Sequence, residues 1–309
     1  MNYTLHQLQI FAKLIETNSV TKTAEAMYLT QPAVSSQLKK LQEQFREPLF
    51  EVVSRRIHIT PFGHEIGLAA GKIMELMESI SHRSEGFTGQ LSGRLRISIV
   101  STGKYVMPYY IAPFIHEHPA VNLSVDVTNK YKVVESLERN EVDFSLVSII
   151  PEHLSLESLD LLPNKLFLVG GKNTGVHSQP QKPAQLEHLP LIYREEGSGT
   201  RLTMERFLSS VGIKQRKRLE LTSNEAVKQA VIAGLGYSVM PLIGIKNELQ
   251  NGDLRILPMK GLPLETTWSL VWPRGKKHAP TALAFIDFLQ KEKSTIASGA
   301  FGWQGNINI

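Results

Sequence analysis

The chain has 309 residues, 34 Lys and Arg against 29 Asp and Glu for a net charge of +5, and no cysteine. This length is sufficient for two or three domains, and the missing cysteine excludes disulfides, cysteine metal ligands and thiol catalysis. No apolar stretch approaches the ~20 residues that span a bilayer, and the N-terminus lacks a secretion-signal pattern, so we expect a soluble, cytoplasmic protein with no membrane contact.

The stretch from Ser19 to Phe45 predicts two short amphipathic helices joined by a tight polar turn. Apolar residues recur at three- and four-residue spacings within each helix, and the phase breaks around Leu29 to Gln31. Thr30 can cap the second helix, and Pro32 is tolerated in its first turn. This layout is typical of a helix-turn-helix, in which the second helix enters the major groove of DNA.

Short polar side chains occupy the first turns of this second helix, and a lysine follows one turn later. Such groups suit base edges, phosphates and thymine methyls. The first 60 residues hold seven Lys and Arg against five Asp and Glu, so placement carries this prediction and net charge does not. The alternative is an ordinary polar helical hairpin. The predicted DNA-binding residues of the helix are Thr30, Gln31, Pro32, Ala33, Ser35, Ser36 and Lys39.

A short β ribbon is predicted next, and it carries Arg55 and Arg56, which complete the predicted DNA-binding set. A ribbon beside a helix-turn-helix forms a wing that can place arginines at the backbone or in the minor groove. With this wing, the run from about Tyr3 to Gly63 resembles the winged helix-turn-helix of LysR-type transcriptional regulators. The matching residues are Leu8, Phe11, Ser19, Ala24, Thr30 to Ser35, Leu38, Leu41, Leu49, Phe50, Arg55, Thr60 and Gly63.

The chain departs from the family pattern at two positions. The family usually carries a second arginine shortly after the Leu49-Phe50 pair, where this chain has Val52, and a glycine after the recognition helix, where it has Arg46. Loss of the arginine predicts one phosphate contact fewer and a weaker salt dependence. Because non-glycine residues resist a left-handed conformation, Arg46 predicts a different exit from the helix.

A long helix is predicted from Pro61 to about Gly89, with an apolar seam at coiled-coil-like spacing. About thirty helical residues extend roughly 45 Å, and a helix of that length with one apolar face needs a partner. That partner is either the chain's own domains or a second copy, and the resemblance implies a two-fold dimer. A hinge is predicted around Gly86 to Gly93. The predicted dimer seam consists of Ile66, Ile73, Leu76, Met77 and Ile80.

Strands and helices alternate from Arg94 to the end of the chain, a pattern typical of open sheets with helices on their faces. The resemblance implies a two-lobed effector region similar in shape to periplasmic binding proteins. Strands are predicted at 94–100, 121–127, 143–149, 165–169, 189–193, 218–221, 237–240, 254–257 and 267–271, and helices at 108–118, 132–140, after Gly199, at 224–233 and from 281 to about 291.

The expected fold is therefore an all-α winged helix-turn-helix N-terminal domain plus a long linker helix, followed by a two-lobed α/β periplasmic-binding-protein-like effector domain. The expected divisions are 1–60 for the DNA-binding domain, 61–92 for the linker helix and hinge, and 93–309 for the effector domain, with lobe I at about 93–162 and 268–309 and lobe II at about 163–267.

Two loops are candidates for a ligand site, because each follows a predicted strand and opens a helix. Their glycines, hydroxyl groups and backbone N–H groups suit a small anion, and Arg201 could pair with it bidentately. Glu195 and Glu196 count against a very highly charged anion unless they point outward. The predicted effector-binding residues are Ser101, Thr102, Gly103, Lys104, Thr128, Ser148, Gly197, Ser198, Gly199, Thr200 and Arg201.

The sequence carries no recognisable catalytic motif. Its histidines lack metal-ligand spacing, Ser198 is not in a nucleophile elbow, and Gly103-Lys104 lacks the glycine spacing of a Walker loop. We therefore expect no enzyme activity, no catalytic residue, no metal and no cofactor.

Two functions remain. The resemblance implies a regulator that binds a dyad promoter site as a dimer or tetramer and changes DNA bending or assembly when a small carboxylate, phosphate or sulfate compound binds between its lobes. Its expected partners are double-stranded promoter DNA, that effector, further copies of the chain and RNA polymerase. The alternative is a solute-binding or transport-associated clamshell. The two candidate loops look most like the branch that includes regulators of carbon-fixation and sulfur-assimilation operons.

Overall fold

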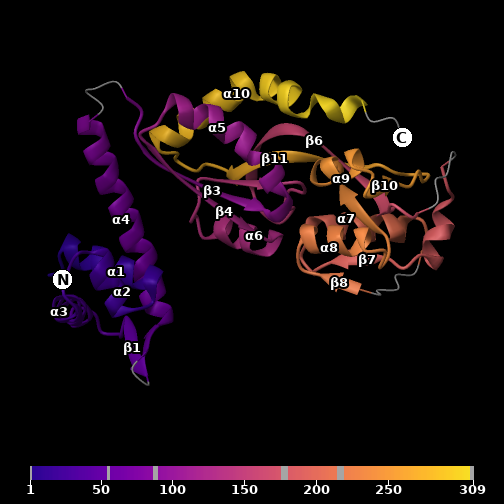
Figure 1. The fold of residues 1–309 in the computed structure, drawn as a ribbon. Coiled ribbons are helices and arrows are strands. Elements are labelled where there is room, and N and C mark those ends of the chain that lie inside the picture. Colours follow the sequence, from indigo (N-terminus) through magenta and orange to yellow (C-terminus); the bar gives the residue numbers. More distant parts are fainter. Residues whose placement is uncertain (1, 54–55, 86–89, 175–179, 214–218, 307–309) are drawn as a thin grey trace. The chain divides into compact units, whose positions relative to one another are not determined.

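The computed structural model describes residues 2–53, 56–85, 90–174, 180–213 and 219–306, and of residues 75, 78–85 and 306 it describes the backbone alone. The chain divides into two compact units, Met1–Gly89 and Gln90–Ile309 (Figure 1). No helix in these ranges is long and apolar enough to cross a membrane.

Three helices form the body of the first unit, α1 (Leu5–Thr17), α2 (Val20–Ala26) and α3 (Gln31–Gln42). Their start points follow from their caps, because side-chain oxygens of Thr4, Ser19 and Thr30 each accept a hydrogen bond from a backbone N–H of the first turn. The apolar faces of the helices close a small core. Its buried members include Ile10, Phe11, Leu14, Ala24, Val34, Leu38 and Leu41.

The wing consists of β1 (Phe50–Val53) paired antiparallel with β2 (Arg56–Ile59). The Gln42 side chain ties the end of α3 to this ribbon, since its Oε1 accepts from the N–H groups of Leu49 and Phe50 at 3.2 and 3.1 Å. α3 ends through Glu43 in a right-handed conformation, and Arg46 is not among the residues with positive φ. Arg46 therefore avoids the left-handed conformation that a glycine would favour. The predicted helix-turn-helix, wing and long helix α4 (Pro61–Glu85) are all confirmed.

The second unit is built on a seven-stranded sheet in the order β10-β6-β11-β5-β3-β4, with β9 paired to β6. β3 runs parallel to β4 and β5, while β11 runs antiparallel to β5 and β6. A separate parallel pair joins β7 to β8. The strands are β3 (Gly93–Val100), β4 (Val121–Thr128), β5 (Phe144–Val147), β6 (Leu156–Gly171), β7 (Ile192–Arg194), β8 (Leu219–Leu221), β9 (Ser238–Pro241), β10 (Leu254–Ile256) and β11 (Leu264–Pro273).

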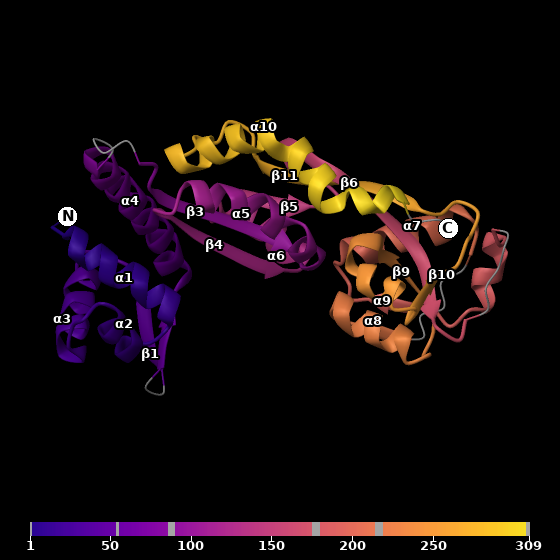
Figure 2. The same ribbon diagram turned by 45° about the horizontal axis from the view of Figure 1, so that its top comes forward.

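Helices cover these sheets on their faces (Figures 1 and 2). The α-helices are α5 (Met107–Glu117), α6 (Lys130–Glu138), α7 (Gly199–Ser210), α8 (Asn224–Ile232), α9 (Lys246–Gln250) and α10 (Pro280–Phe301). Shorter 3₁₀ segments are η2 (Ser101–Tyr105), η3 (Pro183–His188), η4 (Leu242–Gly244) and η5 (Gly302–Asn306). The prediction of a two-lobed α/β region is confirmed, and the residue boundaries of the expected domains and lobes remain predictions.

The long antiparallel pair β6 and β11 joins the two lobes. Leu161 and Leu162 at one end of β6 belong to the core beneath α5 and α10, whereas Phe167 and Val169 at its other end belong to the core beneath α8. The sequence predicted only 165–169 of β6, because Pro163 and Asn164 are disfavoured within strands. It also ended the last helix near Lys291, ten residues too early, whereas α10 continues to Phe301.

A substitution at Gly63 tests the close packing of α4 against Leu49, the residue before the wing. A Cβ at this position would lie 1.9 Å from the backbone oxygen of Leu49, which cannot move aside cheaply. We expect Gly63→Ala to lower the unfolding free energy of the first unit by about 1–3 kcal/mol, measured by urea denaturation of the full chain. The control is Gly71→Ala in the same helix, where nothing lies within 4 Å of the added atom. Better helix propensity should raise stability there by up to ~1 kcal/mol, and equal losses in both variants would contradict this account.

Candidate functional site

One face of α3 presents the predicted DNA-binding residues to solvent. Gln31, Pro32, Ser35, Ser36 and Lys39 are exposed, whereas Val34 and Leu38 face the core. Thr30 is exposed as the cap of the helix, and Ala33 is half-buried. The Gln31 amide donates to Thr21 Oγ1 at 2.5 Å, which ties the first turn of α3 to α2.

The wing adds an exposed cation and two exposed apolar residues. Arg56 is exposed on β2, and Arg55 lies outside the described residues. Val52 and Val53 are 65% and 52% exposed on β1. The position where the family usually has an arginine thus presents a bare isopropyl group to solvent.

The predicted seam of α4 is divided between two surroundings. Ile66 and Ile73 are half-buried against the core of the first unit, together with Ala70. Leu76 and Met77 are exposed, at 65% and 36%. The side chain of Ile80 lies outside the described residues.

Within the second unit, a cavity forms where the carboxyl ends of β3, β5 and β7 meet the first turns of η2, α6 and α7. In open α/β folds this edge is where ligands bind, because strand ends and helix N-termini converge there. The cavity has room for about one water molecule, near 20 Å³. Its lining is Val100, Ser101, Thr102, Asn129, Lys130, Val147, Ser148, Ile149, Arg194, Glu195, Ser198, Gly199 and Thr200.

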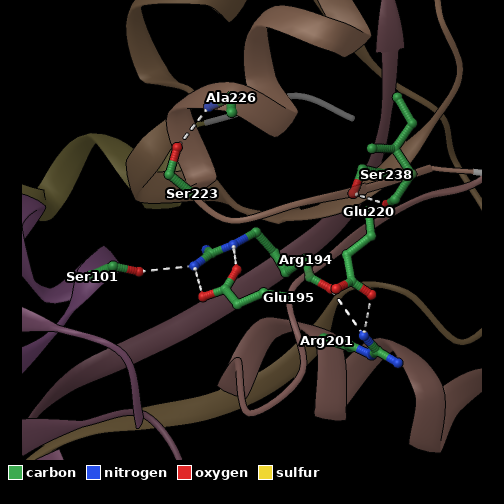
Figure 3. Close-up of polar contacts among 9 residues, drawn as sticks. Ser101, Arg194, Glu195, Arg201, Glu220, Ser223, Ala226 and Ser238 are labelled. Carbon is green, nitrogen blue, oxygen red and sulfur yellow. Dashed lines mark hydrogen bonds and ion pairs between the residues drawn. The ribbon is translucent and has the colours of Figure 1, made fainter. Parts of the chain in front are cut away.

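Arg194, the last residue of β7, is the central polar group of this cavity (Figure 3). Its side chain is only 3% exposed. Nε and Nη2 donate to the two carboxylate oxygens of Glu195 at 2.7 and 2.8 Å, and Nη2 also donates to Ser101 Oγ at 3.1 Å. Nη1 is buried and has no hydrogen-bond partner among the described residues. A buried guanidinium donor without an acceptor is costly, and an anion in the cavity would satisfy it.

Other groups around the cavity favour the binding of a negatively charged ligand. Ser198 precedes α7 but makes no side-chain cap hydrogen bond, so the first N–H groups of this twelve-residue helix remain available to a ligand. Lys130, the first residue of α6, also lines the cavity. Burial lowers the pKa of its ammonium group, and the nearby Arg206 lowers it further. An anion beside Lys130 would offset both effects.

A second and larger cavity of about 620 Å³ adjoins the first, since Ser148 and Ile149 line both. It runs along α7 and β11 and is lined by hydroxyl groups of Thr203, Ser210 and Thr266 as well as by Phe207. This volume falls in the range of small-molecule sites. We call the two adjoining cavities together the cleft.

The structure brings six of the eleven predicted effector residues to the small cavity. These are Ser101, Thr102, Ser148, Ser198, Gly199 and Thr200. The other five, Gly103, Lys104, Thr128, Gly197 and Arg201, do not line it. Gly103 packs against Leu146 and Ile99 of the core, and the Lys104 ammonium lies 5.1 Å from the Tyr105 ring centroid.

Arg201 is engaged elsewhere. Its Nε and Nη1 donate to the carboxylates of Glu205 and Glu220 at 2.6 and 2.8 Å, and the hydrogen bond that it donates to Glu205 raises its pKa although burial opposes the shift. The arginine of this cavity is Arg194, which was not among the predicted effector-binding residues. It stands at the carboxyl end of a strand, and that position alone could have identified it.

The cleft is suited to binding an anion. The described residues contain no group of three or more His, Asp or Glu that could hold a metal ion. Hydroxyls, a guanidinium, an ammonium and a helix N-terminus surround a small space, and such groups recognise phosphate or carboxylate oxygens.

Comparisons with known proteins relate both units to one family. Residues 5–64 match "Bacterial regulatory helix-turn-helix protein, lysR family", and residues 88–294 match "LysR substrate binding domain". The HTH-type transcriptional activator CmpR of Synechocystis sp. is 34% identical, over 93% of this chain and 95% of CmpR. The RuBisCO operon transcriptional regulator of Acidithiobacillus ferrooxidans is 36% identical, over 93% of each chain. The solved Synechocystis CcmR regulatory domain in complex with 2-PG is 32% identical with a TM-score of 0.62, over 64% of this chain and 96% of that one.

The role of Arg201 can be tested by its effect on stability. Arg201→Ala removes the cation that binds Glu205 and Glu220, which are 25% and 30% exposed. We expect it to lower the unfolding free energy by about 1–2 kcal/mol, followed by thermal and urea denaturation. The matched control is Arg139→Ala, which removes a pair of the same i,i+4 spacing from Glu135, at 57% and 37% exposure on α6. This surface pair should contribute less than ~1 kcal/mol. An Arg201→Ala variant as stable as the control would contradict the structural role.

Proposed function

The chain belongs to the LysR family of bacterial transcriptional regulators, and from that premise we propose that Arg194 receives the anionic effector to which this regulator responds. Its family is not enzymatic, and its relatives are named as a transcriptional activator, CmpR, and a RuBisCO operon transcriptional regulator. The carbon-fixation branch expected from the loops is thereby confirmed. The match of residues 5–64 to a regulatory helix-turn-helix removes the solute-binding alternative.

The Nη1 of Arg194, which has no hydrogen-bond partner in the part of the chain that the structure describes, is the observation that carries this proposal. Burying a guanidinium at 3% exposure with such a donor is unfavourable unless a ligand completes the site. The hydroxyls of Ser101, Ser148 and Thr200 and the N-terminus of α7 surround the same space. Tetrahedral phosphate and planar carboxylate groups both fit such a set of donors.

We infer that the effector is a small compound with at least two negative charges, of which 2-PG, bound by the CcmR regulatory domain, is the first candidate. The cavity around Arg194 has room for about one water molecule, so one anionic group is too large for it as it stands. The adjoining 620 Å³ can hold the rest of the molecule. Effector binding therefore requires the groups around Arg194 to move, and this requirement links binding to a change in the lobes.

For DNA, we propose that residues 1–60 read the promoter, residues 61–92 pair two copies, and residues 93–309 sense the effector. The exposed Gln31, Ser35 and Ser36 of α3 suit base edges, and Lys39 and Arg56 suit phosphates. Exposed Leu76 and Met77 on α4 offer an apolar surface to a second copy. A regulator of bacterial promoters acts in the cytoplasm, and RNA polymerase is its expected further partner.

The proposed mechanism couples the cleft to DNA shape. Effector binding shifts the lobes about β6 and β11, which alters the assembly and therefore the spacing of the recognition helices. Bending a promoter site costs about 1–6 kcal/mol, a range that overlaps the ~1–3 kcal/mol of typical ligand coupling.

The effector site is tested by exchanging its arginine. Arg194→Lys retains the charge but cannot bind an anion bidentately, so we expect 2-PG or a related dianion to bind at least about tenfold more weakly. Isothermal calorimetry on the full chain measures this. Arg201→Lys is the control, because Arg201 does not line the cavity, and its affinity should stay within about twofold of the wild type. Equal effects in both variants would argue against Arg194 as the anion receptor.

The DNA-reading surface is tested by gel shift over a range of salt concentrations. Gln31→Ala should weaken binding to the specific site by about 1–3 kcal/mol, and Arg56→Ala should lower the slope of log K against log salt by roughly one. Lys172→Ala removes an exposed cation from the second unit and should change neither quantity. If Gln31→Ala and Arg56→Ala both bind promoter DNA as the wild type does, the proposed surface is wrong.

A further inference from the structure

The partner of Arg194 in the cleft is itself an anion. Glu195 binds the guanidinium side-on with both carboxylate oxygens, the same arrangement that a ligand carboxylate or phosphate would adopt. Its side chain is 15% exposed and lines the small cavity, whereas the next residue, Glu196, is exposed. One of the two neighbouring glutamates thus points inward onto the arginine and the other points outward.

We propose that Glu195 is an internal competitor that occupies Arg194 until an anionic effector displaces it, and that this competition selects dianions over monoanions. The inference rests on the proposed effector site and specifies the ligand class that can open it. Figure 3 shows the chain of contacts from Ser101 through Arg194 to Glu195 that a ligand would have to rearrange.

Glu195 can leave Arg194 without a change in its own backbone. Its backbone N–H donates to the Leu221 carbonyl at 3.1 Å, and its own carbonyl accepts from the Ser198 N–H at 3.2 Å. The backbone of the residue is therefore held on both sides while the carboxylate is held only through Arg194 among the hydrogen bonds of the described residues. Nη1, which no hydrogen bond of the described ranges engages, is the donor that an incoming oxygen can meet before Glu195 leaves.

The preference for dianions over monoanions follows because the ligand must displace Glu195 from Arg194. Glu195 is tethered next to Arg194, so its effective local concentration is on the order of millimolar or above. A monocarboxylate offers Arg194 the same group without the tether and gains little by replacing it. A phosphate carrying two charges, or a molecule with a second anionic group near Lys130 and the α7 N-terminus, gains additional attraction from groups that Glu195 does not bind.

The test compares Glu195→Gln with Glu196→Gln, which remove the same charge from adjacent positions. The amide of Glu195→Gln can still accept one hydrogen bond from Arg194, which keeps the arginine partnered in the unliganded protein. Calorimetry on the full chain measures binding of 2-PG and of acetate as the monoanion. We expect Glu195→Gln to bind 2-PG about tenfold or more tightly than the wild type and to reduce the preference for 2-PG over acetate. Glu196→Gln should stay within about twofold of the wild type for both ligands.

The outcomes separate the two proposals. If the wild type binds 2-PG and Glu195→Gln binds it equally or more weakly, Glu195 is no competitor and this inference is overturned while the effector site stands. If neither protein binds 2-PG, phosphate or acetate, the proposed effector site itself fails. Glu195→Ala, which retains no acceptor for Arg194, provides a second variant in case Glu195→Gln melts below the wild type, and the same gain in affinity is expected from it.

Discussion

In the mechanism that we propose, the response of the second unit depends on the contacts of the buried Arg194 guanidinium. A charge at 3% exposure must be compensated locally, and here the compensation comes from Glu195 on its own loop and from Ser101 at the end of β3. Because these partners come from different elements, any ligand that changes the contacts of Arg194 also changes how β7 is linked to η2. The free energy of anion binding is thereby connected to a structural contact between distant segments of the chain.

Two long paired strands also connect the lobes on either side of this contact. β6 and β11 pair along ten registered positions and contribute to the cores on both sides of the cleft. The last helix adds a further link, since Phe301 packs at 5.0 Å from the Tyr109 ring in α5 while Trp303, two residues on, lies 4.8 Å from the Lys246 ammonium at the start of α9 (Figure 2). These connections consist of strand pairing, an aromatic contact and a cation–π contact. The hydrogen bond from Arg194 to Ser101 adds a polar link that a ligand on Arg194 would alter.

The first unit, unlike the two lobes of the second, is expected to act as one rigid body. Capped helices, a continuous apolar core and the Gln42 bridge from α3 to the wing hold the recognition face rigidly. Rigidity suits a reader of base edges, because side chains displaced by an ångström lose directional hydrogen bonds. Regulation through such a unit is best achieved by changing where it is held relative to a second copy, and α4 carries exposed apolar residues suited to that pairing.

Local signals in the sequence were sufficient to predict the helix-turn-helix, the wing, the long helix and the succession of strands and helices along the chain. Caps, proline positions and apolar periodicity act over a few residues, so they can be seen without the tertiary structure. They also identified six residues around the small cavity, because strand ends followed by hydroxyls and glycines mark ligand loops. They missed the first half of β6, where Pro163 and Asn164 obscure a strand that pairing with β11 stabilises. They also favoured Arg201, which follows the glycines and hydroxyls of the loop, over Arg194, although Arg194 ends a strand. Tertiary structure decided between them, because Glu205 and Glu220 meet Arg201 from one helical turn and a neighbouring strand, whereas burial against Ser101, 93 residues away, places Arg194 in the cleft.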